Sequence, residues 1–311
     1  MRYAIGVDLG GTNIAAGLVD ENWNIVDKIS IPTNAPRPAE EIVRDMAHLT
    51  VELSARNLVL PVGIGIGAPG IISDGIIHAA SNLKFREEPI REMMEKISGM
   101  RCELGNDANA AALGENVAGA GKGADSFVMV TLGPGVGGGI IEQGKIIDGF
   151  NGSGAEIGHF LLHPGGTQCG CGKKGCFEAY CSASALIAMT KEAMRAHPES
   201  AIAKLCGGDE ANINGKTAFD AMREGDAVGK AVVDEYIENL GLGLSNIVVL
   251  LQPEVLAIGG GISREGETLL APLRKIVDEN AYFDAATPRT RLVAATLRSE
   301  AGIVGAAALV M

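Results

Sequence analysis

The sequence predicts an α/β fold in which one arrangement of strands and helices occurs twice. Short apolar runs alternate with segments of helical periodicity along the whole chain. The order strand, glycine turn, strand, polar turn, strand opens the chain in VDLGGTNIAAGLVDENWNIV and returns in VTLGPGVGGGIIEQGKII. The 43 glycines, about twice the usual share, cluster at the ends of apolar runs, where tight turns let backbone approach a ligand.

In the first half we expect three strands followed by alternating helices and strands. Two glycines at 10–11 separate the first two strands, and a polar turn at 20–23 separates the second from the third. The first helix has apolar residues at helical spacing, with Pro38 at its start. We expect strands at 3–9, 13–19, 24–31, 62–67 and 101–105, and helices at 39–56, 88–98 and 108–118.

After residue 118 the pattern starts again, which indicates an internal duplication. We expect strands at 127–132, 140–142, 145–148, 254–258 and 291–295, glycine turns at 133–139 and 259–261, a loop-rich insert at 154–175, and helices at 177–196, 216–224, 226–251, 267–280 and 301–310. These elements predict two domains. The smaller contains residues 1–118 and the last helix at 299–311, and the larger contains residues 119–298 with the insert at 154–178.

The composition excludes several classes of protein. The chain is 47% hydrophobic and 21% charged, so it can bury a core and is not disordered. The formal net charge of −12 argues against nucleic acid as the partner. No uncharged apolar run approaches about 18 residues, and the first residues lack the pattern of a signal peptide. We therefore expect a cytoplasmic protein that binds neither membranes nor nucleic acid.

The first glycine turn has the composition of a phosphate-binding turn. A buried strand delivers Asp8 to the end of a sheet, Gly10 and Gly11 leave their N–H groups uncovered, and Thr12 adds a hydroxyl. Such a turn binds anionic oxygens, and a carboxylate beside it is suited to a magnesium ion. An ordinary Gly-Gly hairpin turn is the alternative.

The second glycine turn, at 133–138, matches the spacing G-x-G-x-x-G of dinucleotide-binding proteins. That fingerprint requires a helix at its third glycine, whereas the following residues indicate a second hairpin. A Walker loop is also absent, because Gly215-Lys216-Thr217 would need a glycine where the chain has Glu210. The segment is therefore interpreted as a second phosphate-binding hairpin.

Three cysteines lie close together after a histidine and indicate a metal site. Cys169, Cys171 and Cys176 follow His159, and three thiolates with one imidazole suit tetrahedral zinc at a closed structural site. A disulfide would leave one cysteine of the three unpaired. His163 is the alternative fourth ligand. The other cysteines are interpreted as small buried apolar residues, at Cys102, Cys181 and Cys206.

Asn106 and Asp107 close an apolar strand and open a helix. An aspartate there is typical of a helix N-cap. A carboxylate at the end of a strand can equally accept the proton of an attacking hydroxyl. The position alone leaves both roles open for Asp107.

Two glycine hairpins and the glycines at 259–261 resemble the duplicated actin-like, ribonuclease H-like fold of the hexokinase superfamily. Within it, the whole chain resembles the ROK family of sugar kinases, most closely those of the bacterial glucokinase type. Four segments carry the resemblance: DLGGT at 8–12, GNDANA at 105–110, GAEIGH at 154–159 and CGCGKKGCFE at 169–178. The resemblance implies two domains with a cleft between them.

The resemblance also implies the roles of individual residues. Asp107 would take the proton of the sugar hydroxyl that attacks the γ-phosphate. His159 would both bind zinc and contact the sugar, so the metal would brace the sugar site. The residues implied to bind the sugar are Gly70, Asn82, Asn106, Asp107, Glu156, His159 and Glu178.

ATP with Mg²⁺ is the implied phosphoryl donor. The residues implied to bind it are Asp8, Gly10, Gly11, Thr12, Asn13, Thr131, Gly133, Gly135, Gly259, Gly260 and Gly261. The chain departs from the family at Pro134, where relatives carry Thr or Ser. Proline offers neither a hydroxyl nor an N–H, so a phosphate contact at 134 is in doubt.

The expected activity is ATP-dependent phosphorylation of a hexose, glucose to glucose 6-phosphate. Fructose, N-acetylmannosamine or N-acetylglucosamine are alternative substrates. A sugar-responsive repressor is a third interpretation, but only seven residues precede Asp8, too few for a helix-turn-helix. A catalytically silent sugar-binding or ATPase module would not need Asp107 and both turns. The resemblance implies a homodimer or homotetramer.

Overall fold

The computed structural model describes residues 1–284 and 286–311 and divides into two compact units. The first unit contains Met1–Met129, Gly138–Ala155 and Ala295–Met311. The second unit contains Val130–Gly137 and Glu156–Ala294. The domain limits predicted at residues 118 and 298 stay predictions. No helix among the described residues is long and apolar enough to cross a membrane.

A five-stranded mixed sheet forms the centre of the first unit, in the order β3-β2-β1-β4-β8. β1 pairs antiparallel with β2 and parallel with β4, and β8 continues the parallel side. Alternate residues of β1 and β4 are fully buried against α1 and α2. The strands are β1 Tyr3–Leu9, β2 Asn13–Asp20, β3 Ile25–Pro32, β4 Ile64–Ala68 and β8 Cys102–Asn106, and the helices of this unit are α1 Ala39–Asn57, α2 Ile90–Ser98, α3 Asp107–Ala118 and α10 Ala301–Ala308.

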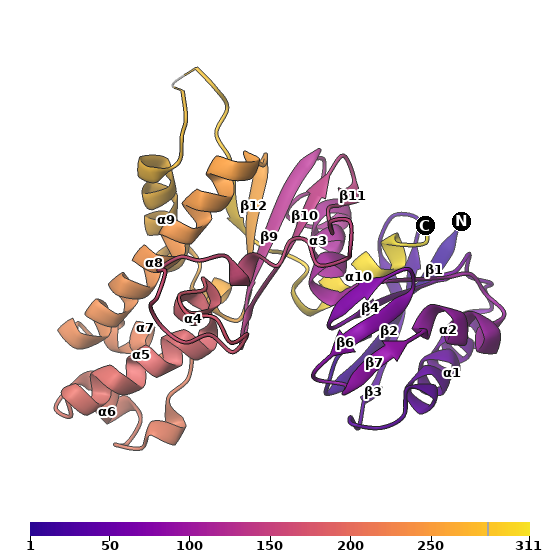
Figure 1. The fold of residues 1–311 in the computed structure, drawn as a ribbon, viewed down its shortest axis with the longest axis horizontal. Helices are drawn as coiled ribbons and strands as arrows, with labels where there is room; N and C mark the ends of the chain where they lie inside the picture. Colours follow the sequence, from indigo (N-terminus) through magenta and orange to yellow (C-terminus); the bar gives the residue numbers. More distant parts are fainter. Residues whose placement is uncertain (285) are drawn as a thin grey trace. The chain divides into compact units, whose positions relative to one another are not determined.

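The C-terminal helix α10 packs directly on this sheet and on α3 (Figure 1). Glycines make the approach possible, because a Cβ on Gly6 would lie 1.9 Å from the Ile303 carbonyl oxygen and one on Gly65 would lie 1.7 Å from that of Ala306. The fully buried Glu115 carboxylate of α3 anchors the segment before α10. It accepts hydrogen bonds from the backbone N–H groups of Ala120, Thr296 and Leu297 at 2.8, 3.0 and 2.6 Å.

Three further strands of the first unit were not predicted. β5 Ile71–Ser73, β6 Ile76–Ala80 and β7 Phe85–Glu88 form a separate antiparallel sheet. The predicted order βββαβαβα is therefore incomplete. These strands have three to five residues each, and runs of that length are too short to establish a period of two.

The second sheet repeats the strand order of the first, as β11-β10-β9-β12-β13. Each sheet has three consecutive strands in reverse order, β3-β2-β1 in the first and β11-β10-β9 in the second, and then two strands from later in the chain. This repeat confirms the predicted duplicated α/β fold. The expected turn at 133–139 is too long, because β10 already begins at Val136. Gly139 serves close packing instead, since a Cβ there would lie 2.5 Å from the Ala112 Cβ on α3. The strands are β9 Ser126–Leu132, β10 Val136–Glu142, β11 Lys145–Ile146, β12 Val255–Gly260 and β13 Arg291–Ala294.

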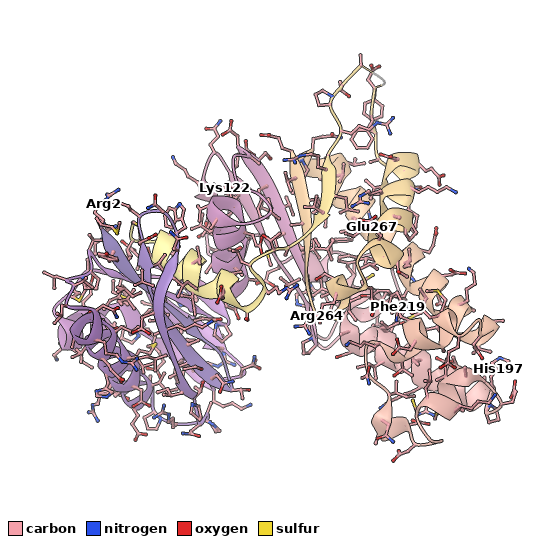
Figure 2. The ribbon with its side chains drawn as sticks, turned by 180° about the vertical axis from the view of Figure 1, so that it is seen from behind. Arg2, Lys122, His197, Phe219, Arg264 and Glu267 are labelled. Carbon is pink, nitrogen blue, oxygen red and sulfur yellow. The ribbon has the colours of Figure 1, made fainter. Side chains whose placement is uncertain are left out.

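Helices make up most of the second unit and surround a core that includes the fully buried Phe219, labelled in Figure 2. The single helix predicted at 177–196 is wrong. Ser182 has extended backbone angles, and its hydroxyl accepts a hydrogen bond from the Ala185 N–H at 3.0 Å, so a new helix begins there. The helices are α4 Glu178–Cys181, α5 Ala183–Ala196, α6 Ala201–Leu205, α7 Thr217–Arg223, α8 Ala227–Leu251 and α9 Glu267–Asn280.

Candidate active site

In the first unit the candidate residues gather where the parallel strands β1, β4 and β8 end. The register places Asp8 beside Gly67, and Gly67 beside Gly105, two residues before Asp107. A Cβ on Gly67 would lie only 3.6 Å from the Asp107 Cα, so the absence of a side chain leaves room between the two aspartates. Ligands of open α/β sheets bind at this carboxyl edge.

Burial makes both carboxylates more basic than ordinary aspartates, and repulsion by Asp107 adds to this effect at Asp8. Burial, and then the negative charge of Asp107, raise the pKa of Asp8 from 3.8 to about 6. Burial also raises the pKa of Asp107, an effect partly offset by the hydrogen bond from the Ala108 N–H. A bound cation would relieve the repulsion, and a raised pKa suits a group that must accept a proton.

The first glycine turn is held from outside by Thr33. Its hydroxyl donates to the Gly10 carbonyl at 2.7 Å, and its N–H donates to the Thr12 carbonyl at 2.8 Å. The expectation that both glycine N–H groups are uncovered is wrong for Gly10, whose N–H closes the hairpin on the Asn13 carbonyl at 2.9 Å. Gly11 lies next to the candidate residue Asn82, because a Cβ on Gly11 would be 3.1 Å from the Asn82 Cβ.

Asn106 is the residue that caps α3. Its side-chain oxygen accepts from the N–H groups of Ala108 and Asn109 at 2.9 and 3.1 Å, so capping is not the main role of Asp107. The Asn106 amide also donates to the Gly70 carbonyl at 3.1 Å. Gly70 has φ of 108°, and a Cβ there would lie 2.1 Å from the Ala79 carbonyl oxygen. These contacts fix both candidate sugar ligands and leave Asn106 one amide hydrogen to donate.

A cavity of about 220 Å³ in the first unit adjoins Asn106. Asn109, which sequence reasoning did not select, also lines it. The Asn109 side-chain oxygen is buried and has no hydrogen-bond partner among the described residues. A polar pocket of this size has room for ordered water, which would satisfy that oxygen.

In the second unit the predicted metal ligands come together. One ligand atom each of His159, Cys169, Cys171 and Cys176 lies within 4.8 Å of all the others. The Cys171 and Cys176 sulfurs are 3.6 Å apart, and the Cys169 sulfur is 3.8 Å from His159 Nδ1. Tetrahedral zinc with Zn–S bonds of about 2.3 Å requires such separations of roughly 3.8 Å, so the donor set fits zinc.

His163, the alternative ligand, lies outside the cluster. Its Nε2 is 2.6 Å from the Asn239 side-chain oxygen on α8, and its ring packs edge-on against Tyr180. His163 therefore attaches the insert at 154–178, called the metal loop below, to helix α8. The cysteines interpreted as apolar are buried, at Cys102, Cys181 and Cys206.

Glu178 links the metal loop to the second glycine turn. The Val136 N–H donates to its Oε2 at 3.0 Å, and the Cys169 thiol lies 3.4 Å from its Oε1. The Ala183 N–H donates to the Gly133 carbonyl at 2.8 Å, so two adjacent helices hold the turn. Val136 and Glu178 are 42 positions apart, and nothing in their local sequence indicates the contact.

The remaining candidates of the second unit occupy separate elements. Glu156 is exposed and precedes the short 3₁₀ helix Ile157–His159, while Thr131 lies in β9. The turn predicted at 259–261 is shorter than expected, because β12 continues through Gly260. Gly260 has φ of 85°, and a Cβ there would lie 2.2 Å from the Leu132 carbonyl oxygen, so this position requires glycine.

A sheet order used twice, with carboxylates and a glycine turn at the strand ends of one unit, defines the two-domain sugar kinase fold. The ROK family model matches residues 4–311, and the chain belongs to this family. A glucokinase of Thermotoga maritima is 38% identical, over 98% of this chain and 96% of its own.

Solved structures and other relatives agree with this assignment. The ROK family glucokinase of Streptomyces griseus, in complex with glucose and AMPPNP, is 38% identical with a TM-score of 0.81, over 99% of both chains. An N-acetylmannosamine kinase of Escherichia coli is less similar, at 29% identity over 99% of this chain and 98% of its own.

Proposed function

We propose that the chain catalyses ATP-dependent phosphorylation of glucose to glucose 6-phosphate. The observation that carries the proposal is the half-buried carboxylate of Asp107, at the start of α3 and close to Asp8 and the first glycine turn. Its raised pKa suits a group that accepts a proton during the reaction. Glucose is proposed over N-acetylmannosamine because the glucokinase relative is 38% identical and the N-acetylmannosamine kinase 29%.

In this proposal Asp107 accepts the proton of the attacking sugar hydroxyl as the bond from its oxygen to the γ-phosphorus forms and the bond from that phosphorus to the bridging oxygen of ADP breaks, so that ADP leaves. Mg²⁺ bound with ATP would neutralise charge on the phosphates, and Asp8 is the carboxylate placed to hold it. The N–H groups of Gly11 and Thr12 would bind phosphate oxygens. Thr12 and the following Asn13 are exposed at the turn.

Six residues besides Asp107 are proposed as sugar ligands. Gly70, Asn82 and Asn106 belong to the first unit, whereas Glu156, His159 and Glu178 belong to the second. The carboxylates and amides among them can accept from and donate to vicinal hydroxyls. Zinc bound by the four-residue cluster would hold the loop rigid, and His159 would keep Nε2 for the sugar because Nδ1 faces the cysteines.

The proposed nucleotide contacts of the second unit come from two segments. They are Thr131, Gly133 and Gly135 in and after β9, and Gly259, Gly260 and Gly261 at the end of β12. Pro134 supplies no donor, so Gly135 is expected to contribute the N–H of this turn. We further propose a homodimer or homotetramer, which light scattering would test.

A panel of sugars tests the proposal directly. ADP release would be measured with glucose, fructose, N-acetylmannosamine and N-acetylglucosamine under identical conditions. We expect glucose to give the highest kcat/KM, with product phosphorylated at the primary hydroxyl. A higher value for another hexose would reassign the substrate, and sugar-independent ADP release with every sugar would contradict the proposed activity.

A further inference from the structure

Glu178 has a contact that binding a sugar does not require. Its Oε2 accepts a hydrogen bond from the Val136 N–H at 3.0 Å. Val136 is only 5% exposed and is the first residue of β10, directly after the second glycine turn. A buried backbone N–H without a partner costs about 1–3 kcal/mol, so this carboxylate is part of the structure of the turn.

The same contact limits which N–H groups of the turn can meet a nucleotide. The Gly133 N–H is already bonded to the Gly135 carbonyl at 3.0 Å, and Pro134 has no N–H. The Val136 N–H is bonded to Glu178. Of these four residues, Gly135 is therefore the one whose N–H is left for a phosphate oxygen, and its position depends on both neighbours.

Gly135 itself lies directly against the carboxylate. A Cβ at this position would be 2.4 Å from Glu178 Oε2, so a larger residue would push the carboxylate away from the Val136 N–H. On the other side, the Ala183 N–H holds the Gly133 carbonyl at 2.8 Å. The turn is thus fixed at both ends by the segment that opens α4 and α5.

We propose that Glu178 is a positioning residue for the nucleotide, in addition to the sugar contact assigned to it. This inference rests on the proposed function, because it assumes that the turn at 133–135 binds phosphate. The carboxylate would hold the turn in the conformation that presents the Gly135 N–H. One consequence is that residues of the metal loop influence ATP affinity even before a sugar binds.

The test is the affinity for AMPPNP with Mg²⁺, measured by calorimetry in the absence of sugar. We expect Glu178→Ala to weaken binding about tenfold, because the Val136 N–H loses its acceptor. Glu178→Gln should stay within about twofold of the unaltered protein, since the amide oxygen can accept the same hydrogen bond. Both variants should lose glucose turnover.

Glu156→Ala is the matched control, because Glu156 is also a proposed sugar ligand but, among the described residues, its side chain forms no hydrogen bond with the turn. It should lower glucose turnover and leave AMPPNP affinity within about twofold. Unchanged or tighter AMPPNP binding by Glu178→Ala would overturn the inference, and tighter binding would indicate that the carboxylate repels the phosphates. Failure of the unaltered protein to bind AMPPNP would instead contradict the proposed function.

Hydrogen exchange gives a readout that needs no ligand. The Val136 amide should exchange slowly in the unaltered protein and in Glu178→Gln, and at least tenfold faster in Glu178→Ala. Gly135→Ala should show the same faster exchange, because its Cβ displaces the carboxylate. If the Val136 amide exchanged equally slowly in all variants, at equal metal content, the proposed positioning of the turn by Glu178 would be ruled out.

Discussion

The two glycine turns occupy the same place in two sheets of identical strand order, yet their surroundings differ in charge. In the aligned segments VDLGG and VTLGP, Asp8 of the first turn corresponds to Thr131 of the second. A neutral residue, Thr33, braces the first turn, whereas the carboxylate of Glu178 braces the second. The acidic group of the first turn is Asp8, two residues before Gly10 in the sequence. The acidic group of the second turn is Glu178, which comes from a distant segment and accepts a hydrogen bond from the residue after the turn.

This difference indicates that duplication preserved the scaffold while the two halves took different tasks. The first unit holds the half-buried pair Asp8 and Asp107, whose raised pKa values suit cation binding and proton transfer. The second holds the cluster of His159 and three cysteines proposed to bind zinc, and a turn whose hydrogen-bond acceptor, Glu178, is also a proposed sugar ligand. The comparison predicts that changes at Asp8 and Asp107 affect chemistry, and that changes at the cysteine cluster and the second glycine turn affect binding.

The largest effect is expected from Asp107→Asn. The amide keeps the size of the side chain but cannot accept the proton, so kcat should fall about 10³-fold. Calorimetry should show glucose and AMPPNP affinities within about threefold of the unaltered protein. Near-normal kcat would show that Asp107 is not the general base. It would also contradict the proposal that the two units have different chemical roles.

Loss of the metal should affect the second unit next most strongly. In Cys176→Ser we expect the bound metal to fall below one ion per chain and kcat/KM for glucose to fall about 10–100-fold, because His159 and Glu178 lose their support. Elemental analysis and steady-state kinetics measure these quantities. Cys206→Ser, at a buried cysteine outside the cluster, should retain the metal. Full metal content in Cys176→Ser would contradict the ligand assignment.

Asp8→Asn should make the first unit more stable and the enzyme less active. The folded pKa of about 6 exceeds the ordinary 3.8, so the folded state binds more protons between these values, and the contribution of Asp8 to stability falls as pH rises through them. The variant should gain about 1–2 kcal/mol in urea unfolding at pH 8 without Mg²⁺, and less as pH falls toward 4. Thr131→Val, at the corresponding position, should show no such pH dependence. An equal gain at both pH values would mean that ionisation of Asp8 is not the cause.

The smallest effect is expected from Pro134→Thr. Threonine adds a hydroxyl and an N–H to the second turn, at the position where the family resemblance implies Thr or Ser. We expect KM for ATP to fall by a factor of about two to five, with kcat for glucose unchanged. An increase in KM would indicate that the rigid φ of proline, rather than an additional donor, favours nucleotide binding.

Local patterns predicted the duplicated fold, both glycine turns and the metal cluster, because each is specified within about 20 residues. The spacing and types of residues were enough to predict the glycine turn at 8–12 and the cluster of candidate metal ligands at 159–176. The break at Ser182 also has a local signal, because serine is a typical helix N-cap residue. The helical periodicity on both sides of Ser182 nevertheless predicted one continuous helix. The strands β5–β7 were missed because each is too short to show a period.

Other features depend on the folded chain. The contact between Val136 and Glu178, and the bond between His163 and Asn239, join residues that are 42 and 76 positions apart. The Gly10 N–H is occupied because Asn13 returns across a tight hairpin, a detail that the glycine spacing alone does not determine. The raised pKa of Asp8 likewise requires its burial and the nearness of Asp107.

The packing of α10 also determines the order in which the units can be completed during translation. Gly6 and Gly65 form a flat strip on the sheet that α10 covers, and the Glu115 carboxylate needs the backbone of Thr296 and Leu297. The ribosome makes these partners after the whole of 130–294. The second unit can therefore finish folding first, while this face of the first unit's sheet stays uncovered until α10 has been made.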